Sequence, residues 1–211
     1  MLFRSLVEEP LAALMGFGPD VPAAAAHLLL DVGAGRSVVA ILSRGRCLSS
    51  EILKVCGDLM DEAVRKDCLE RFELFLGLGM AEQVKMTLGS AVALPEPLTM
   101  PVPGKNRHSG APVPVEVSDA AVREALAEPA QALADAVARM LAKVPADLAP
   151  AVRGQGLLLC GGGSLLRGLD QYLGERAGLP VLRAEDPLAC VARGVARIAA
   201  EQPDLAKAFL G

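Results

Sequence analysis

Three consecutive glycines, Gly161, Gly162 and Gly163, stand between a short apolar run and Ser164, where a helical pattern begins. Glycine has no Cβ, so such a turn can adopt positive φ and lets a flat ligand approach the main chain closely. A helix that follows the turn directs its free N–H groups toward that ligand. The pattern predicts a nucleotide-binding turn, although a glycine-rich corner without a ligand has the same sequence.

A second glycine-rich turn joins two apolar runs, 28–32 and 38–42. Such a turn can fold its backbone N–H groups around phosphate oxygens. Asp31 ends the first run, where its carboxylate could hold a hydrated Mg²⁺ through water; an aspartate beside glycine also commonly caps a turn. The candidate phosphate-binding residues of this turn are Gly33, Ala34, Gly35, Arg36 and Ser37.

Glu82 and Lys85 form a third candidate group, because a spacing of three residues places both on one side of a helix. The carboxylate could accept hydrogen bonds from ribose hydroxyls, and the lysine stem could lie along a purine. The alternative is an ordinary surface salt bridge between the two side chains.

The composition limits the other classes of function. The chain has 211 residues, of which 52% are hydrophobic and only 3% aromatic, and its net charge is −4. An acidic chain of this kind offers no basic face, so we do not expect binding to nucleic acid. An apolar run of the roughly 18 residues needed to cross a membrane is missing, and Glu8 and Glu9 stand where a signal peptide would be apolar.

Cysteine and histidine usage indicates neither disulfides nor a metal site. The five cysteines are odd in number and lack CxxC spacing, which is typical of reduced, buried thiols in a cytoplasmic protein. His27 and His108 have no partner at ligand spacing, so we expect no metal bound by protein ligands alone.

The order of periodic segments predicts an α/β layer fold with mixed strand directions. A proline-rich stretch, 94–117, is expected to be a hairpin in a small inserted lobe or else a loose linker. Asp58 is the expected N-cap of one helix, and Pro129 is expected to break another. Helices are predicted over 10–18, 57–72, 80–91, 118–143, 164–176 and 188–200, and strands over 28–32, 38–43, 47–55, 156–160 and 181–184.

Taken in order, these motifs resemble the actin-like ATPase superfamily and, within it, the MreB family of bacterial cell-shape proteins. The resemblance covers nearly the whole chain, and its most specific parts are 161–170 and 184–194. The other matching segments are 6–13, 31–37, 57–63 and 81–85.

The resemblance implies an actin-like (ribonuclease H-like) mixed sheet flanked by helices, with a small inserted α+β lobe. Residues 1–22 would be a remnant of a first-domain helix. Residues 23–71 and 118–211 would form the second large domain, and 72–117 the inserted lobe.

The resemblance also implies binding of ATP or ADP with Mg²⁺, and filaments formed with itself or with a full-length homologue. Glu9 matches the position that orients the attacking water. Expected partners are the cell-shape and elongation machinery, with the protein in the cytoplasm at the inner membrane face and in contact with the membrane only through partners. The expected nucleotide-binding residues are Asp31, Gly33, Ala34, Gly35, Arg36, Ser37, Gly57, Glu82, Lys85, Gly161, Gly162, Gly163 and Ser164.

The sequence departs from the family pattern in three respects, one of which is Cys56 in place of the glycine that is usual before Gly57 and Asp58. It begins where the family's second half begins, so the first phosphate loop has no counterpart and we expect little or no hydrolysis. Ala34 replaces a glycine, while Arg36 and Ser37 replace threonines. One alternative is a nucleotide-free module that binds filament or cell-shape partners. A further alternative is a chaperone- or sugar-kinase-type ATPase of the same superfold.

Overall fold

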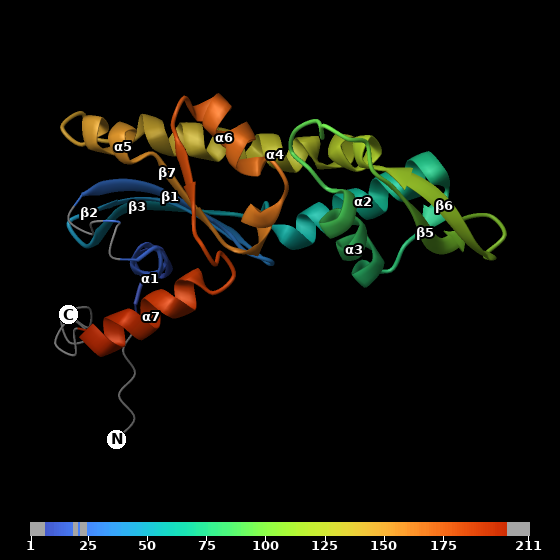
Figure 1. The fold of residues 1–211 in the computed structure, drawn as a ribbon, viewed down its shortest axis with the longest axis horizontal. Coiled ribbons are helices and arrows are strands. Elements are labelled where there is room, and N and C mark those ends of the chain that lie inside the picture. The colour runs from blue at the N-terminus through green and yellow to red at the C-terminus, as the bar shows by residue number, and fades with distance from the viewer. Residues whose placement is uncertain (1–6, 19–20, 22–24, 202–211) are drawn as a thin grey trace, which may run out of the picture.

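A five-stranded sheet forms the centre of the larger part of the molecule (Figure 1). The computed structural model describes residues 7–18, 21 and 25–201. In the sheet order β3-β2-β1-β7-β8, the first three strands are antiparallel, while β7 and β8 run parallel to β1. The bounds are β1 Ala26–Val32, β2 Ser37–Ser43, β3 Arg46–Leu53, β7 Leu157–Cys160 and β8 Val181–Arg183.

Helices cover both faces of this sheet (Figure 1). On one face lie α4 (Asp119–Ala142), α5 (Ala149–Gln155) and α6 (Leu169–Ala177); α1 (Glu9–Gly16) lies on the other, with α7 (Cys190–Glu201) packed against it. Successive residues of β1 point to opposite faces, so Leu28 and Leu30 join one hydrophobic cluster and Leu29 the other. The predicted α/β fold, with a mixed sheet flanked by helices, is confirmed.

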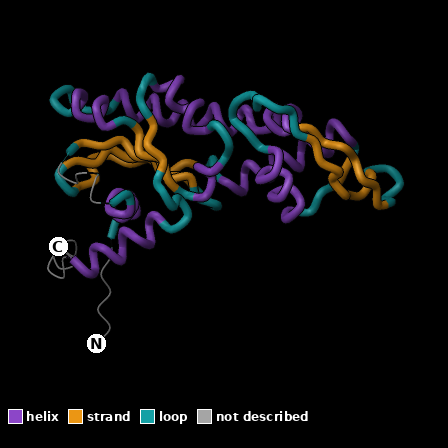
Figure 2. Tube along the Cα trace, viewed as in Figure 1, coloured by secondary structure: helices purple, strands orange, loops and turns teal. Residues whose placement is uncertain are grey.

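The remaining strands form a separate three-stranded sheet in a small lobe, as Figure 2 shows. The stretch predicted to be a hairpin or a linker is a hairpin, in which Val102 pairs with Val115. Its strand β6 lies at the edge of the sheet and pairs on one side only, a position where proline is tolerated. The lobe contains α2 (Gly57–Phe72), β4 (Leu74–Phe75), α3 (Leu78–Leu88), β5 (Thr99–Asn106) and β6 (Pro112–Ser118).

The domain division expected at 22, 71 and 117 stays a prediction. Residues 1–6, 19–20, 22–24 and 202–211 lie outside the described residues, so parts of the predicted first and last segments cannot be placed. Within the described chain, α2 packs against both α3 and α4.

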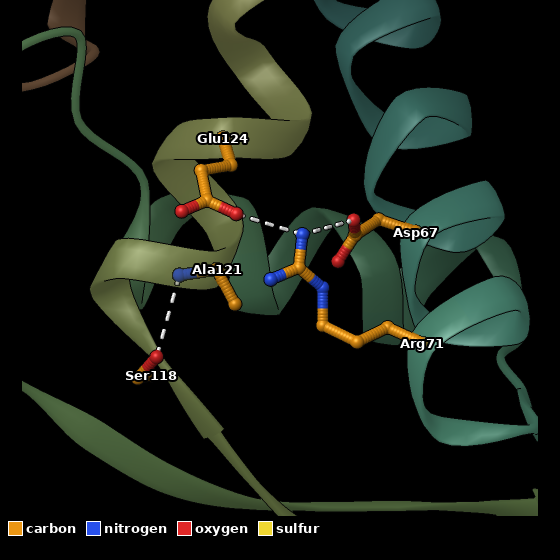
Figure 3. A network of polar contacts seen from close by, with 5 residues as sticks. All are labelled: Asp67, Arg71, Ser118, Ala121 and Glu124. Atoms are coloured by element: carbon orange, nitrogen blue, oxygen red, sulfur yellow. Dashed lines mark hydrogen bonds and ion pairs between the residues drawn. The ribbon is translucent and has the colours of Figure 1, made fainter.

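The long helix α4 connects the lobe to the sheet. In the lobe, Arg71 Nη2 of α2 lies 2.8 Å from Glu124 Oε2 of α4 and 3.1 Å from Asp67 Oδ1 (Figure 3). At the far end of α4, Arg139 Nη2 lies 2.7 Å from Glu51 Oε1 of β3. The helix therefore extends from one sheet to the other.

The break predicted at Pro129 is wrong, because α4 runs through it without interruption. Proline removes one helical N–H, but Pro129 is buried between Leu126 and Leu133, whose packing holds the helix on both sides. The start of α4 is capped by Ser118, whose Oγ accepts from the Ala121 N–H at 3.3 Å (Figure 3).

Two other helix predictions are also wrong. Cys56, not Asp58, is the N-cap of α2, and Asp58 lies within its first turn. The helix expected from 164 begins only at Leu169, because Gly168 adopts a left-handed φ of 69° and is preceded by a short 3₁₀ turn, η1 (Gly162–Leu165). The helix α5, which is short and contains a proline, was not predicted.

Helices α1 and α7 touch through glycines. A Cβ on Gly194 would lie 1.7 Å from the carbonyl oxygen of Ala12, and one on Gly16 would lie 1.9 Å from that of Cys190. The backbones can approach this closely only because neither glycine has a side chain.

We predict that Gly194→Ala lowers the free energy of unfolding by about 3 kcal/mol, because the added methyl group must push the two helices apart. Gly154→Ala is the matched control, since a Cβ there meets nothing within 4 Å and alanine favours the helix by up to about 1 kcal/mol. Urea unfolding measures both. Equal stability of the two variants would contradict the close packing of α1 on α7.

Candidate functional site

A pocket of about 590 Å³ opens where the glycine turns of the large sheet meet α2 and α3. Five segments contribute to it: the β1–β2 turn, the start of α2, α3 with Gly89, the glycine turn after β7 with the residues that follow it, and Leu188. The lining residues are Gly33, Ala34, Gly57, Asp58, Met60, Asp61, Glu82, Lys85, Met86, Gly89, Gly162, Gly163, Leu165, Leu166, Arg167 and Leu188.

The β1–β2 turn is rigidly held. The Gly33 N–H donates to the Arg36 carbonyl at 3.0 Å, and the turn is too tight for a Cβ at Gly33, which would lie 2.6 Å from that oxygen. The first amides of α2 bind the same turn: Gly57 N–H donates to the Gly33 carbonyl and Asp58 N–H to the Ala34 carbonyl, both at 2.9 Å. The turn therefore presents a fixed backbone to the pocket.

The three glycines after β7 have different roles. Gly161 has a φ of 80°, and a Cβ there would lie 2.3 Å from Asp31 Oδ1. A Cβ on Gly163 would lie 2.3 Å from Val32 Cγ1. Tight packing against β1 thus accounts for both. At Gly162 a Cβ would meet only the flexible end of the Leu188 side chain. Packing therefore explains the glycines at 161 and 163 but not the one at 162.

Lys85 joins α3 to α2. Its Nζ lies 2.8 Å from Asp61 Oδ1 and donates to the Gly57 carbonyl at 3.2 Å. Burial raises the pKa of the Asp61 carboxyl, and the neighbouring Lys85 opposes that shift. Lys85 is therefore paired with Asp61 rather than with Glu82, while Glu82 lines the pocket with an exposed side chain.

A cluster of charges lies at the end of β1. Arg36 Nη2 lies 2.6 Å from Glu9 Oε2 in the first turn of α1. Asp31 is buried, and its pKa is raised to about 6, first by burial and then by Glu9, against the opposing effect of Arg36 and a hydrogen bond with Cys160. These three groups do not line the pocket.

Seven of the predicted residues line the pocket and seven do not. Two of the latter have hydroxyls that are already used, since Ser37 Oγ donates to the Val55 carbonyl and Ser164 Oγ to that of Gly161, both at 2.6 Å. The pocket includes Gly33, Ala34, Gly57, Glu82, Lys85, Gly162 and Gly163, and leaves out Glu9, Asp31, Gly35, Arg36, Ser37, Gly161 and Ser164.

Sequence reasoning did not assign Asp61, Met86, Arg167 or Leu188 to the site. Asp61 could have been found, because it follows Gly57 by four residues on one face of a helix whose start was predicted. Leu188 carried no such signal, since only the fold brings its segment to the glycine turn.

The described part of the chain has neither a metal site built from protein side chains nor a membrane-spanning helix. In the described ranges, His, Cys, Asp and Glu side chains form no group of three or more that could hold a metal ion. Among the helices that the structure describes, none is both long and apolar enough to cross a membrane.

We predict that Asp31→Asn stabilises the protein more at pH 7.5 than at pH 4.5. The folded-state pKa of about 6 exceeds the ordinary value of 3.8, so the wild type loses stability as pH rises between the two values. Asparagine cannot ionise, and its advantage should grow by about 2 kcal/mol between these pH values. Chemical denaturation at both pH values measures the free energy of unfolding of the variant and of the wild type. The exposed Asp147→Asn is the control, and an equally flat response from both variants would contradict the burial of the Asp31 charge.

Comparison with known proteins identifies the relatives of this chain. The family model for MreB/Mbl protein matches residues 4–207. The cell shape-determining protein MreB of Escherichia coli (strain K12) is 38% identical over 189 residues, which is 90% of this chain and 54% of the relative. The cell shape-determining protein Mbl of Bacillus subtilis (strain 168) is 31% identical over 189 residues, covering 90% and 57%. The chain thus spans about half the length of these curated relatives.

Solved structures share the fold. The crystal structure of MreB5 of Spiroplasma citri bound to ADP matches with a TM-score of 0.89 and 30% identity, over 97% of this chain and 61% of that one. A MamK double helical filament matches with a TM-score of 0.77 and 24% identity, over 93% and 60%. Because the family model spans nearly the whole sequence and the architecture agrees, this chain belongs to the MreB/Mbl family and has an actin-like fold.

Proposed function

We propose that this chain is a cytoskeletal element of bacterial cell shape that binds ATP or ADP, with Mg²⁺, in the pocket between the glycine turns and α3. One observation carries the proposal: three predicted segments, around Gly33, Glu82 and Gly162, converge on a single pocket of about 590 Å³. A volume of 300–1,000 Å³ is usual for small-molecule sites. The related MreB5 structures bound to ADP and AMPPNP support the same ligand class.

The nucleoside would occupy the part of the pocket between α3 and the turn after β7. Apolar side chains of Met86, Leu165 and Leu188 line that part and suit a flat base. The exposed carboxylate of Glu82 would accept hydrogen bonds from ribose hydroxyls. Gly162 would lie against the adenosine, because a side chain there would project toward the ligand.

The phosphates would lie toward the β1–β2 turn, where Gly33 and Ala34 line the pocket. Mg²⁺ keeps several waters and binds through one or two carboxylates together with substrate phosphates. The carboxylate of Asp31 is buried behind the turn and does not line the pocket, so it would hold such an ion only through water. When bound, the ion would neutralise part of the phosphate charge.

We expect this chain alone to hydrolyse ATP slowly or not at all. Phosphoryl transfer depends on groups that position the terminal phosphate, the metal and the water together. The described residues supply the β1–β2 turn and Glu9, whose carboxylate could orient a water. The curated relatives are about twice as long as the matched region.

We further propose that the chain assembles with itself or with a full-length homologue at the inner face of the membrane. Its partners would be the elongation machinery, and it would contact the membrane only through them, without binding nucleic acid. MamK, which shares the fold, forms a double helical filament, and this supports testing the present chain for assembly.

We predict that MgATP and MgADP bind the purified chain at micromolar concentration and that Gly162→Asp abolishes this binding. The new carboxylate would occupy the space of the adenosine and repel the phosphates. Isothermal titration calorimetry measures the affinities. Gly77→Asp is the matched control: it adds the same charge at the other end of α3, where a Cβ meets nothing within 4 Å.

The two variants separate the proposal from its alternative. Binding that survives in Gly77→Asp but is lost in Gly162→Asp supports a working nucleotide site. No heat from the wild type at millimolar nucleotide would instead favour a nucleotide-free interaction module, in which both glycine turns are structural only.

We also predict that the chain sediments with filaments of a full-length MreB homologue in the presence of MgATP. Ultracentrifugation with the homologue alone, the chain alone and the mixture measures this. Recovery of the chain in the supernatant of both samples that contain it would argue against assembly.

A further inference from the structure

Arg36 is the polar side chain of the β1–β2 turn that remains available to a ligand. In the turn 33–37, Ala34 has no polar group, and Ser37 is buried with its hydroxyl bonded to Val55. The Arg36 side chain is 58% exposed. An anion that reaches this turn can therefore meet one side-chain donor group, the guanidinium.

That guanidinium is already paired, but weakly. Its Nη2 lies 2.6 Å from Glu9 Oε2, and the Glu9 side chain is itself 34% exposed. Exposed ion pairs contribute little net stability and are screened by salt. A phosphate group of higher charge can therefore compete with Glu9 for Arg36.

The backbone of the turn would not need to move during such an exchange. The Arg36 carbonyl accepts from Gly33 N–H, and the turn is bonded to the first amides of α2 through Gly33 and Ala34. The change is confined to the Arg36 side chain, whose long stem can rotate in solvent.

We propose that Arg36 senses the terminal phosphate of a bound nucleotide. Without a triphosphate it holds Glu9, and with one it moves to the γ-phosphate and releases the Glu9 carboxylate. The planar guanidinium can offer two parallel N–H donors to phosphate oxygens. A diphosphate lacks the terminal group, so Arg36 would favour ATP over ADP. This inference rests on the proposed nucleotide binding and deepens it.

The test compares dissociation constants for MgATP and MgADP by titration calorimetry. Arg36→Gln should weaken MgATP binding about tenfold and leave MgADP within about twofold. Glu9→Gln should have the opposite sign, tightening MgATP by about twofold to fivefold, because it removes the competitor for Arg36. The MgATP affinity of Arg36→Lys should lie between those of the wild type and Arg36→Gln. Lysine keeps the positive charge but lacks the two parallel N–H donors of the guanidinium.

Arg139→Gln is the matched control. Arg139 also forms an exposed ion pair between two elements, with its Nη2 2.7 Å from Glu51 Oε1. Like Arg36 it does not line the pocket, but it belongs to α4 and not to the β1–β2 turn. Both nucleotide affinities should stay at the wild-type value in this variant.

Two results would overturn the proposal, and they have different meanings. If Arg36→Gln and Arg36→Lys leave MgATP affinity unchanged, or weaken MgATP and MgADP equally, Arg36 is not a sensor although nucleotide binding stands. If the wild type binds neither nucleotide, the sensor and the proposed function fail together.

Discussion

Two backbone hydrogen bonds hold the start of α2 against the end of the large sheet. They run from the first amides of α2, at Gly57 and Asp58, to the carbonyls of Gly33 and Ala34. The first N–H groups of a helix have no acceptor within it, so the β1–β2 turn satisfies donors that burial would otherwise penalise. The pocket exists because this contact brings α2, and with it α3, to the end of β1.

The same contact changes the expected role of the helix. A helix N-terminus is a ready site for phosphate when its amides are free. Here the amides of Gly57 and Asp58 are directed to the turn. An anion bound at this end of the pocket would therefore need other donors, and the exposed guanidinium of Arg36 is one candidate.

Much of the fold could be predicted because it depends on local patterns. Continuous apolar runs mark β1 and β2, which are buried along their whole length, and Ser118 marks the start of α4. Prediction failed where tertiary packing overrides a local rule. Pro129 does not end α4, because apolar neighbours on both sides hold the helix together.

In the candidate site, too, local patterns were predictable and contacts between distant elements were not. The glycine turns are visible in the sequence, since their composition directly reflects close backbone approach. The pairing of Lys85 with Asp61, and of Arg36 with Glu9, joins residues on different elements. Spacing along one helix could suggest only Glu82 as the partner of Lys85. Such pairs depend on how the elements pack, which no local pattern contains.

The parallel pairing of β1 with β7 has a consequence for how the chain folds. Leu28 pairs with Leu157, and the whole small lobe and α4 lie between them in the sequence. Closing so long a segment costs chain entropy before the contact is gained, whereas the β1–β2 and β2–β3 hairpins close over short turns. We therefore expect the antiparallel strands and the lobe to form early and β7 and β8 to join the sheet late. Since Gly162 lies two residues after the end of β7, the pocket would be among the last parts of the molecule to be completed.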